Sequence, residues 1–189
     1  MLEPKQEHLK IEEYLEGEKF SDVKHEYIDG EVYAMVGATN AHNLIAGNAF
    51  GEIRNHLKGN PCNAYVSDMK VKVENKFFYP DVMVDCSEGA DSKSLFKESP
   101  ALIVEVLSDS TKVTDKTIKF ATYQRIPSLQ EYVLVEQDCM SVEVFRRSEN
   151  WHGQVYLKGE KIHFESIDLI LPIEEIYIGL NLGTDEPKT

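Results

Sequence analysis

The run Ala-Leu-Ile-Val-Glu-Val-Leu at residues 101–107 is the feature that most limits the folds open to this chain. All but one of its residues are apolar, and the apolar residues do not alternate with polar ones. Such a short run is typical of a central strand that is buried on both faces of a sheet. We therefore expect a layered domain in which other elements cover both sides of this strand.

Helices and strands mix along the rest of the chain. Asp29-Gly30 lies between two strand-like runs, which is a strong hairpin signal. Apolar residues recur at helical spacing from Asn40 to about Leu57. This order predicts an α+β domain with a mixed sheet. The other expected elements are helices at 5–17 and 115–125, strands at 64–74, 77–86, 130–136, 141–147 and 154–158, and a short turn at 173–177.

The length and the two ends of the chain indicate one domain. The 189 residues fit a single unit, predicted here at 1–180 with a polar tail at 181–189. No apolar run approaches the ~20 residues of a membrane span. The first residues are polar and acidic, without the apolar segment of a signal peptide. We therefore expect a cytoplasmic protein that does not enter a membrane.

The cysteines are three in number and far apart, at positions 62, 86 and 139. Their spacing matches neither a zinc site nor a disulfide framework. The sequence therefore predicts that Cys62, Cys86 and Cys139 are thiols in a reducing compartment.

The net charge of −13 disfavours a protein that binds nucleic acid through bulk charge. It leaves two possibilities open. Lysine and arginine side chains on a few elements could form a local positive surface, and a cluster of carboxylates could hold a metal ion.

Two acids stand where strand patterns disfavour them. Asp81 follows Pro80 at the start of one strand, and Glu105 interrupts the apolar run near the end of another. If these strands pair antiparallel, the two carboxylates converge. Hard oxygen ligands suit Mg²⁺ or Mn²⁺. The alternative is structural, with Asp81 capping a turn and Glu105 paired with a lysine.

Hydrolysis of a phosphodiester also needs a group that orients water or stabilises negative charge. Lys119 is the candidate, on the helix that follows the Glu105 strand. Lys116 and Tyr123 lie one turn to either side of it and can share its face. The alternative is a solvated basic face, which is the usual place of helix lysines.

Four blocks of the sequence together resemble the Uma-two-type restriction endonucleases, a family within the PD-(D/E)XK nuclease superfamily. The blocks are HEYIDGEVYAM, PDVMVDC, ALIVEVLSDST and DKTIKFATYQRIPSLQEYVLVE, and the resemblance covers the chain from about Glu26 to Tyr177. The resemblance implies a restriction-endonuclease-like mixed β-sheet core flanked by helices, with additional β-hairpins.

The resemblance also implies a site. Asp81 matches the first acid of the motif and Glu105 matches the second. The superfamily pattern has a lysine two residues after the second acid, where this chain has Leu107. Lys119 matches the position on the following helix to which the lysine moves. Glu26 matches an upstream acid that supports the metal, and His42 resembles a further family position near the start of a helix.

The expected function is a metal-dependent DNA endonuclease. Asp81 and Glu105 would bind Mg²⁺ or Mn²⁺, Lys119 and Glu26 would complete the catalytic set, and His42, Lys116 and Tyr123 would contact substrate. The expected partners are DNA, held with modest affinity, and a second copy of the chain in a homodimer. The alternative is a catalytically inactive nuclease-fold binding module. A small-molecule enzyme has less support, because the chain lacks a glycine-rich phosphate loop and a nucleophile elbow.

Overall fold

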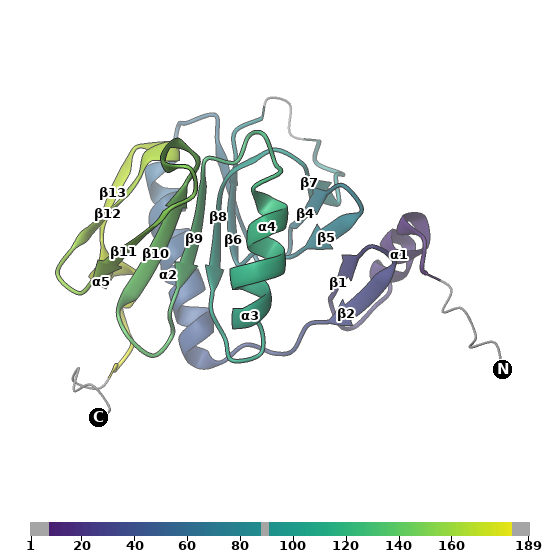
Figure 1. The fold of residues 1–189 in the computed structure, drawn as a ribbon, viewed down its shortest axis with the longest axis horizontal. Helices are drawn as coiled ribbons and strands as arrows, with labels where there is room; N and C mark the ends of the chain where they lie inside the picture. Colours follow the sequence, from purple (N-terminus) through teal and green to yellow (C-terminus); the bar gives the residue numbers. More distant parts are fainter. Residues whose placement is uncertain (1–7, 88–90, 183–189) are drawn as a thin grey trace.

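The computed structural model describes residues 8–87 and 91–182. Figure 1 shows two sheets side by side, the larger one flanked by several helices and the smaller one by a single helix. We call the six-stranded sheet with its covering elements the body, and the five-stranded sheet with helix α1 the lobe. This mixed α+β architecture confirms the predicted fold class.

The body sheet has the strand order β11-β10-β9-β8-β6-β3. Strand β8 (Pro100–Val106) is the apolar run, and it lies inside the sheet between β6 and β9, as predicted. It pairs parallel with β9 and antiparallel with β6. The other body strands are β3 (Asn63–Val66), β6 (Val82–Asp85), β9 (Glu131–Val135), β10 (Ser141–Arg146) and β11 (Gly153–Leu157).

Alternate residues of the body strands face opposite layers. Val82 and Val84 pack toward helix α2 (Asn40–His56), whereas Met83 and Ile103 belong to the apolar cluster on the other face. That second face is covered by one helical segment made of α3 (Lys112–Thr114), the π-helical turn η1 (Asp115–Lys119) and α4 (Phe120–Tyr123). The β12–β13 hairpin and a short helix complete the α2 side, with β12 (Lys161–Phe164), β13 (Leu169–Pro172) and α5 (Ile173–Ile176).

The lobe sheet has the strand order β2-β1-β5-β4-β7. Its first hairpin turns at Asp29 and Gly30, whose φ angles of 50° and 104° fit the predicted Asp-Gly turn. A small aromatic core of Tyr14, Tyr27 and Phe77 joins the sheet to α1. The lobe elements are α1 (Ile11–Glu18), β1 (His25–Ile28), β2 (Glu31–Ala34), β4 (Lys70–Val73), β5 (Lys76–Phe78) and β7 (Phe96–Lys97).

Two strand predictions were wrong at the junction of the sheets. The predicted strand 64–74 is divided into β3 and β4, and the predicted strand 77–86 is divided into β5 and β6. In each case one half pairs in the body and the other in the lobe. Ser67 adopts a φ of 54°, Pro80 cannot donate a ladder hydrogen bond, and the Ser67 amide donates to the Asp81 carbonyl at 3.0 Å. We call the junction at 67–69 and 79–81 the bend.

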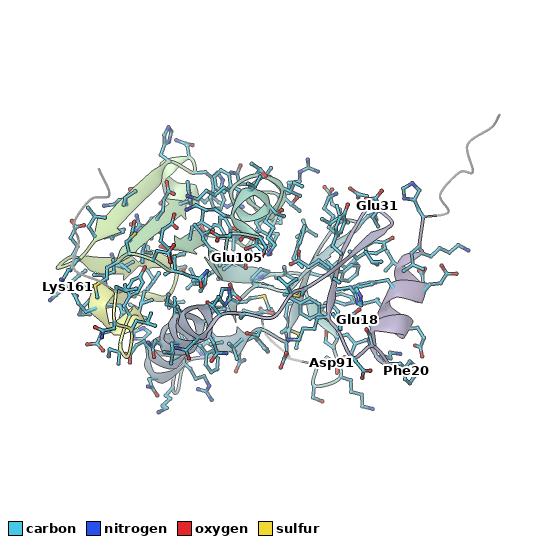
Figure 2. All side chains as sticks on the ribbon, turned by 90° about the horizontal axis from the view of Figure 1, so that it is seen from below. Glu18, Phe20, Glu31, Asp91, Glu105 and Lys161 are labelled. Carbon is cyan, nitrogen blue, oxygen red and sulfur yellow. A yellow bond between two sulfur atoms is a disulfide. The ribbon has the colours of Figure 1, made fainter. Side chains whose placement is uncertain are left out.

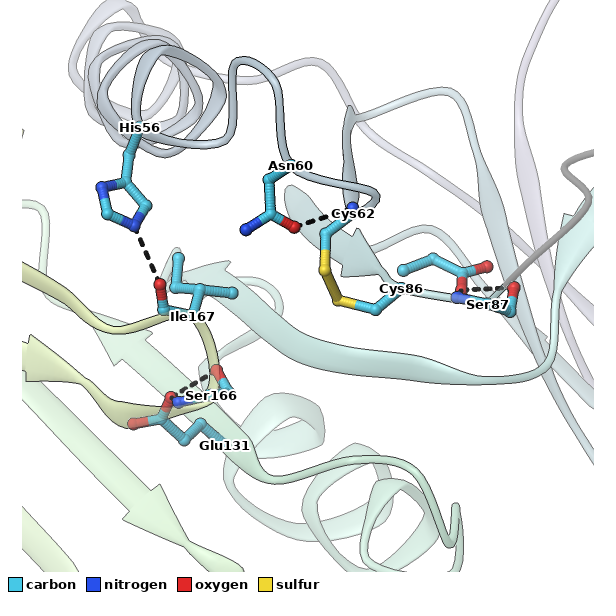
Figure 3. The surroundings of a disulfide bond; sticks show 9 residues. His56, Asn60, Cys62, Cys86, Ser87, Glu131, Ser166 and Ile167 are labelled. Carbon is cyan, nitrogen blue, oxygen red and sulfur yellow. Dashed lines mark hydrogen bonds between the residues drawn. A yellow bond between two sulfur atoms is a disulfide. The ribbon is translucent and has the colours of Figure 1, made fainter.

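The thiol prediction was wrong for Cys62 and Cys86, which form a disulfide (Figure 3). Strands β3 and β6 pair with Asn63 opposite Asp85, so one further step of this register places the two cysteines opposite each other. Their Cα atoms are 4.0 Å apart. The two cysteines are far apart in the sequence, so their spacing did not indicate the contact that the antiparallel pairing creates. Cys139 is exposed.

The helix limits differ slightly from the predictions. Helix α1 runs through Gly17 to Glu18, and residues 5–7 of the predicted helix lie outside the described residues. The predicted helix 115–125 begins earlier and ends at Tyr123. Strands β7, β12 and β13 were not predicted, and most of the predicted tail lies outside the described residues. In residues 8–87 and 91–182, no helix is long and apolar enough to cross a membrane.

Candidate active site

The pairing of β6 with β8 brings Asp81 and Glu105 together. The two strands run antiparallel with Val82 opposite Val104, and one further step of this register places Asp81 opposite Glu105. Directly opposite residues of an antiparallel pair share one face of the sheet. That face is the one covered by the helical segment 112–123, because Met83 and Ile103 pack there. The antiparallel pairing on which the prediction depends is therefore present, and the Asp81 carboxylate is close enough to raise the pKa of Glu105.

Glu105 is a buried carboxyl held by two donors. Its side chain is 3% exposed, and its Oε1 accepts hydrogen bonds from Lys119 Nζ at 3.1 Å and from the Tyr123 hydroxyl at 3.0 Å. Burial raises the pKa of the Glu105 carboxyl well above its ordinary value, and the neighbouring carboxylates add to this effect. The Lys119 ammonium opposes the shift. Glu105 therefore favours an additional positive charge beside it.

Lys119 is the buried cation of the site. Its Nζ lies 3.1 Å from Glu26 Oε1, 3.1 Å from Glu105 Oε1 and 3.0 Å from Asp115 Oδ1. Burial alone lowers the pKa of the ammonium, but the three carboxylates outweigh it and hold the pKa well above its usual value. Lys119 therefore stays protonated in the folded protein.

The π-helical turn η1 explains how Lys119 reaches inward. Asp115 and Lys119 begin and end this turn, and both side chains are buried. The Tyr132 hydroxyl donates to the Asp115 carbonyl at 3.0 Å and ties the turn to β9. Single π-helical turns are frequent at functional sites, because the extra residue changes which side chains face inward.

Glu26 comes to the site from the lobe. It lies on β1, and its Oε1 accepts a hydrogen bond from the Tyr79 amide at 3.2 Å while it contacts Lys119. The Glu26–Lys119 ion pair therefore joins the lobe to the helical segment of the body.

His42 lies in the first turn of α2, where the Thr39 side chain accepts a hydrogen bond from its amide. Its Nε2 is 3.3 Å from Asp81 Oδ2, which also accepts a hydrogen bond from the Val106 amide at 2.7 Å. Burial lowers the pKa of the imidazole, but the Asp81 carboxylate and the Val106 backbone together raise it above its ordinary value. His42 is thus a hydrogen-bond donor beside the Asp81 carboxylate.

Lys116 lies apart from this cluster. Its side chain is 38% exposed and its Nζ is 3.5 Å from Glu136 Oε1. Tyr123 lies inside the cluster but is fully buried, so its hydroxyl positions Glu105 and does not face solvent. Figure 2 shows Glu105 on the body and Glu18 and Glu31 on the lobe.

Sequence reasoning missed Asp115. Its Oδ1 is fully buried, lies within ion-pair distance of Lys119, and has no hydrogen-bond partner among the described residues. The available signal was its position four residues before Lys119 on a predicted helix, where side chains of opposite charge meet.

The carboxylate oxygens of the site suit a divalent cation that is bound by only a few protein ligands. In the described part of the chain, Asp81 Oδ1 and Glu105 Oε2 accept no hydrogen bond, and no three His, Cys, Asp or Glu side chains form a metal cage. Mg²⁺ is usually held by one or two carboxylates together with waters and substrate phosphates. Three carboxylates contact the single lysine and Asp81 is a further charge beside Glu105, which leaves a negative surplus. Asp81 and Glu105 are therefore suitable ligands.

Comparisons with known proteins agree with this architecture. Residues 11–173 match the family model Uma2, described as "Putative restriction endonuclease". The uncharacterized protein slr1290 of Synechocystis sp. is 35% identical over 176 residues, which cover 91% of this chain and 93% of that protein. The uncharacterized protein sll1609 of the same organism is 36% identical over 143 residues, which cover 74% of this chain and 81% of that protein.

A solved structure shares the fold. It is described as a "putative nuclease belonging to DUF820" from Anabaena variabilis, and it matches with a TM-score of 0.71 and 18% identity. The match covers 83% of this chain and 91% of the solved one. The predicted restriction-endonuclease-like fold is thereby confirmed.

Proposed function

The chain belongs to the Uma2 family, and from this premise we propose that it is a metal-dependent endonuclease that hydrolyses phosphodiester bonds in DNA. One observation carries the proposal. The pairing of β6 with β8 brings Asp81, just before β6, near Glu105, and Glu105 contacts the buried Lys119. Two carboxylates and one ammonium are the groups that such a hydrolysis requires.

Each side chain has a distinct task in this proposal. A divalent cation at Asp81 and Glu105 would lower the pKa of a water molecule and offset charge on the phosphate. Lys119 stabilises the negative charge that develops on the phosphate or orients the attacking water. Glu26 and Asp115 keep Lys119 protonated and fix its position. Tyr123 holds Glu105, and His42 donates a hydrogen bond to a substrate phosphate beside Asp81.

The proposed setting is a homodimer in the cytoplasm that binds DNA with modest affinity. Strand β11 ends the body sheet, and its Val155 and Leu157 are 52% and 54% exposed. An unpaired edge with apolar side chains is a suitable surface for a second copy of the chain. Light scattering after size exclusion measures the mass: twice the chain mass is expected, and the mass of one chain would contradict the dimer.

The test combines metal binding with cleavage. Mn²⁺ is titrated calorimetrically into the wild-type protein, Asp81→Asn and Glu105→Gln, and the same samples are assayed for plasmid nicking with Mg²⁺ or Mn²⁺. We expect the wild-type protein to bind Mn²⁺ and to nick the plasmid. Both variants should lose metal binding and nicking, while circular dichroism shows that their fold is intact. Chelation of the metal should also stop nicking.

Asp168→Asn is the matched control. Asp168 is an exposed acid at the end of the body, and its left-handed φ of 52° is compatible with asparagine. This control should nick like wild type. Unchanged nicking by Asp81→Asn would refute the assigned site. Wild-type protein that neither binds Mn²⁺ nor nicks DNA would instead favour the catalytically inactive binding module.

A further inference from the structure

Lys70 is a buried lysine without a counter-ion. Among the described residues three lysines are buried, and two of them have carboxylate partners: Lys97 lies 3.5 Å from Asp85, and Lys119 lies in the candidate site. Lys70 is 7% exposed, and its ammonium makes no hydrogen bond or ion pair with any residue in 8–87 or 91–182. An ammonium taken out of water without such a partner is costly.

The contact that Lys70 does make is with an aromatic ring. It lies opposite Tyr79 when the β4–β5 register is continued by one residue, and its Nζ is 5.0 Å from the ring centroid. The Tyr79 hydroxyl is held by Glu18 Oε1 at 3.1 Å, so the ring is fixed. A cation–π contact contributes about 0.5–2 kcal/mol, which is less than the several kcal/mol of desolvation. The cation–π contact therefore does not offset the cost of taking the Lys70 ammonium out of water.

The ammonium remains within reach of a ligand. Among the described residues, the one fully buried side-chain polar atom without a hydrogen bond is Asp115 Oδ1, so Lys70 Nζ keeps some contact with solvent. Burial lowers the pKa of Lys70, and the Glu18 carboxylate partly opposes that shift without forming an ion pair. An anion that arrived from solvent would supply the missing partner.

A second lysine lies over the same ring. Lys24 Nζ is 5.7 Å from the Tyr79 centroid and donates to the Ser67 carbonyl at 3.2 Å. Its carboxylate partner, Asp68, is 84% exposed, so this ion pair contributes little and can exchange for another anion. Two ammonium groups thus converge on Tyr79.

This pair of lysines adjoins the candidate active site through the bend. The Ser67 amide donates to the carbonyl of Asp81, and the Tyr79 amide donates to Glu26. Figure 2 shows Glu18, which holds the Tyr79 hydroxyl, on the lobe that flanks the body. A nucleic acid strand with its reacting phosphate at Asp81 would continue across the bend toward these ammonium groups.

We propose that Lys70, assisted by Lys24, binds a backbone phosphate of the nucleic acid substrate next to the phosphate that is cleaved. The inference rests on the proposed function, and it assigns part of substrate binding to the lobe. Phosphate contacts are independent of sequence, and each one makes affinity more dependent on salt.

The experiment measures binding of a short fluorescein-labelled DNA duplex by anisotropy between about 50 and about 200 mM salt, without divalent cations so that no cleavage occurs. Lys70→Gln should reduce the slope of log affinity against log salt by about 0.9. It should weaken binding by about tenfold at the lowest salt, equally for unrelated duplex sequences. Lys24→Gln should change the slope in the same direction.

Lys72→Gln is the matched control. Lys72 lies two residues along β4 and therefore on the same face of the strand, but its Nζ is paired with Glu98 at 2.9 Å. The slope of log affinity against log salt for Lys72→Gln should equal that of wild type. Lys70→Arg, which keeps the charge, should restore the slope, and it keeps the test decisive if Lys70→Gln fails to fold.

The outcomes separate this inference from the proposed function. Wild type that nicks DNA, with an unchanged slope in Lys70→Gln, overturns the phosphate site alone. Equal loss of slope in Lys70→Gln and Lys72→Gln also overturns it, because only bulk charge would then matter. Wild type that does not bind the duplex overturns both the DNA substrate and this inference.

Discussion

The body and the lobe contribute different parts of one site. The body has large apolar clusters on both faces of its sheet, one of which also takes in Val71, Val73 and Phe78 of the lobe. The body elements hold Glu105 and Lys119, and Asp81 lies just before β6. The lobe depends on a few aromatic side chains, and it supplies Glu26 and an ammonium without a counter-ion. In the proposed function, the chemistry therefore belongs to the larger sheet, and the smaller sheet contributes Glu26 and the phosphate-binding lysines.

The largest expected effect distinguishes the two cores. Phe77 is fully buried against Tyr14, Tyr27 and Phe96, so Phe77→Ala should lower the free energy of unfolding by about 3–5 kcal/mol. Hydrogen exchange should show the loss of protection in β1, β4 and β5, with protection in β9 and β10 retained.

The neighbouring residue is the control, because it faces the opposite way. Phe78 packs edge-on against Tyr123 with ring centroids 5.5 Å apart, so Phe78→Ala should weaken protection in the body as well. Equal loss of protection in both sheets after Phe77→Ala would show that body and lobe unfold as one unit.

The second effect concerns the cation that joins the two regions. Lys119→Met should reduce the nicking rate by about 10²–10³-fold, as removal of a charge-stabilising donor commonly does. It also leaves buried carboxylates without their partner, so urea denaturation should report lower stability. Lys161→Met, at an exposed position of β12 at the far end of the body, should leave both quantities unchanged (Figure 2). A rate within a few-fold of wild type would remove Lys119 from the catalytic set.

A smaller effect is expected for the carboxylate from the lobe. Glu26→Gln retains an acceptor for the Tyr79 amide, and Lys119 keeps Glu105 and Asp115 as partners. We expect about a tenfold lower nicking rate, equivalent to about 1.4 kcal/mol. A loss as large as that of Glu105→Gln would mean that the lobe takes a direct part in the chemistry.

The smallest effect is the pH dependence of stability at Lys70. Burial lowers the pKa of this lysine in the folded state, so between that pKa and the ordinary value of about 10.4 the unfolded chain binds more protons. Stability of wild type should therefore rise with pH relative to Lys70→Met, by less than about 1.4 kcal/mol per pH unit. Urea denaturation from about pH 7 to about pH 10 measures the difference, and parallel curves would contradict it.

Local patterns predicted the elements that form within one sheet. The Asp29-Gly30 hairpin, helix α2 and the apolar strand β8 follow from turn chemistry, helical spacing and burial on both faces. The bend was missed because two strands continue from one sheet into the other, and only Ser67 and Pro80 mark the change.

The candidate site was predictable to a similar degree. The acids and Lys119 were found from their unusual positions and from the family blocks. The spacing of Asp115 and Lys119 offered a signal for their ion pair, but the burial of both side chains depends on tertiary packing, and the Cys62–Cys86 disulfide depends on strand register. Contacts of this kind follow from tertiary pairing and not from local sequence.

The bend has a mechanical consequence. Two strand crossings, from β3 to β4 and from β5 to β6, pass through it, and the Ser67 amide and Asp81 carbonyl join them there. The β7–β8 connection crosses separately at residues 98–99. In a rotation of one sheet against the other, atoms near the axis move least, and displacement grows with distance from it. For a rotation about the bend, Asp81 would lie near the axis, whereas Glu26 would move with the lobe. Opening the two sheets would withdraw a carboxylate from Lys119 and leave Asp81 aligned with Glu105.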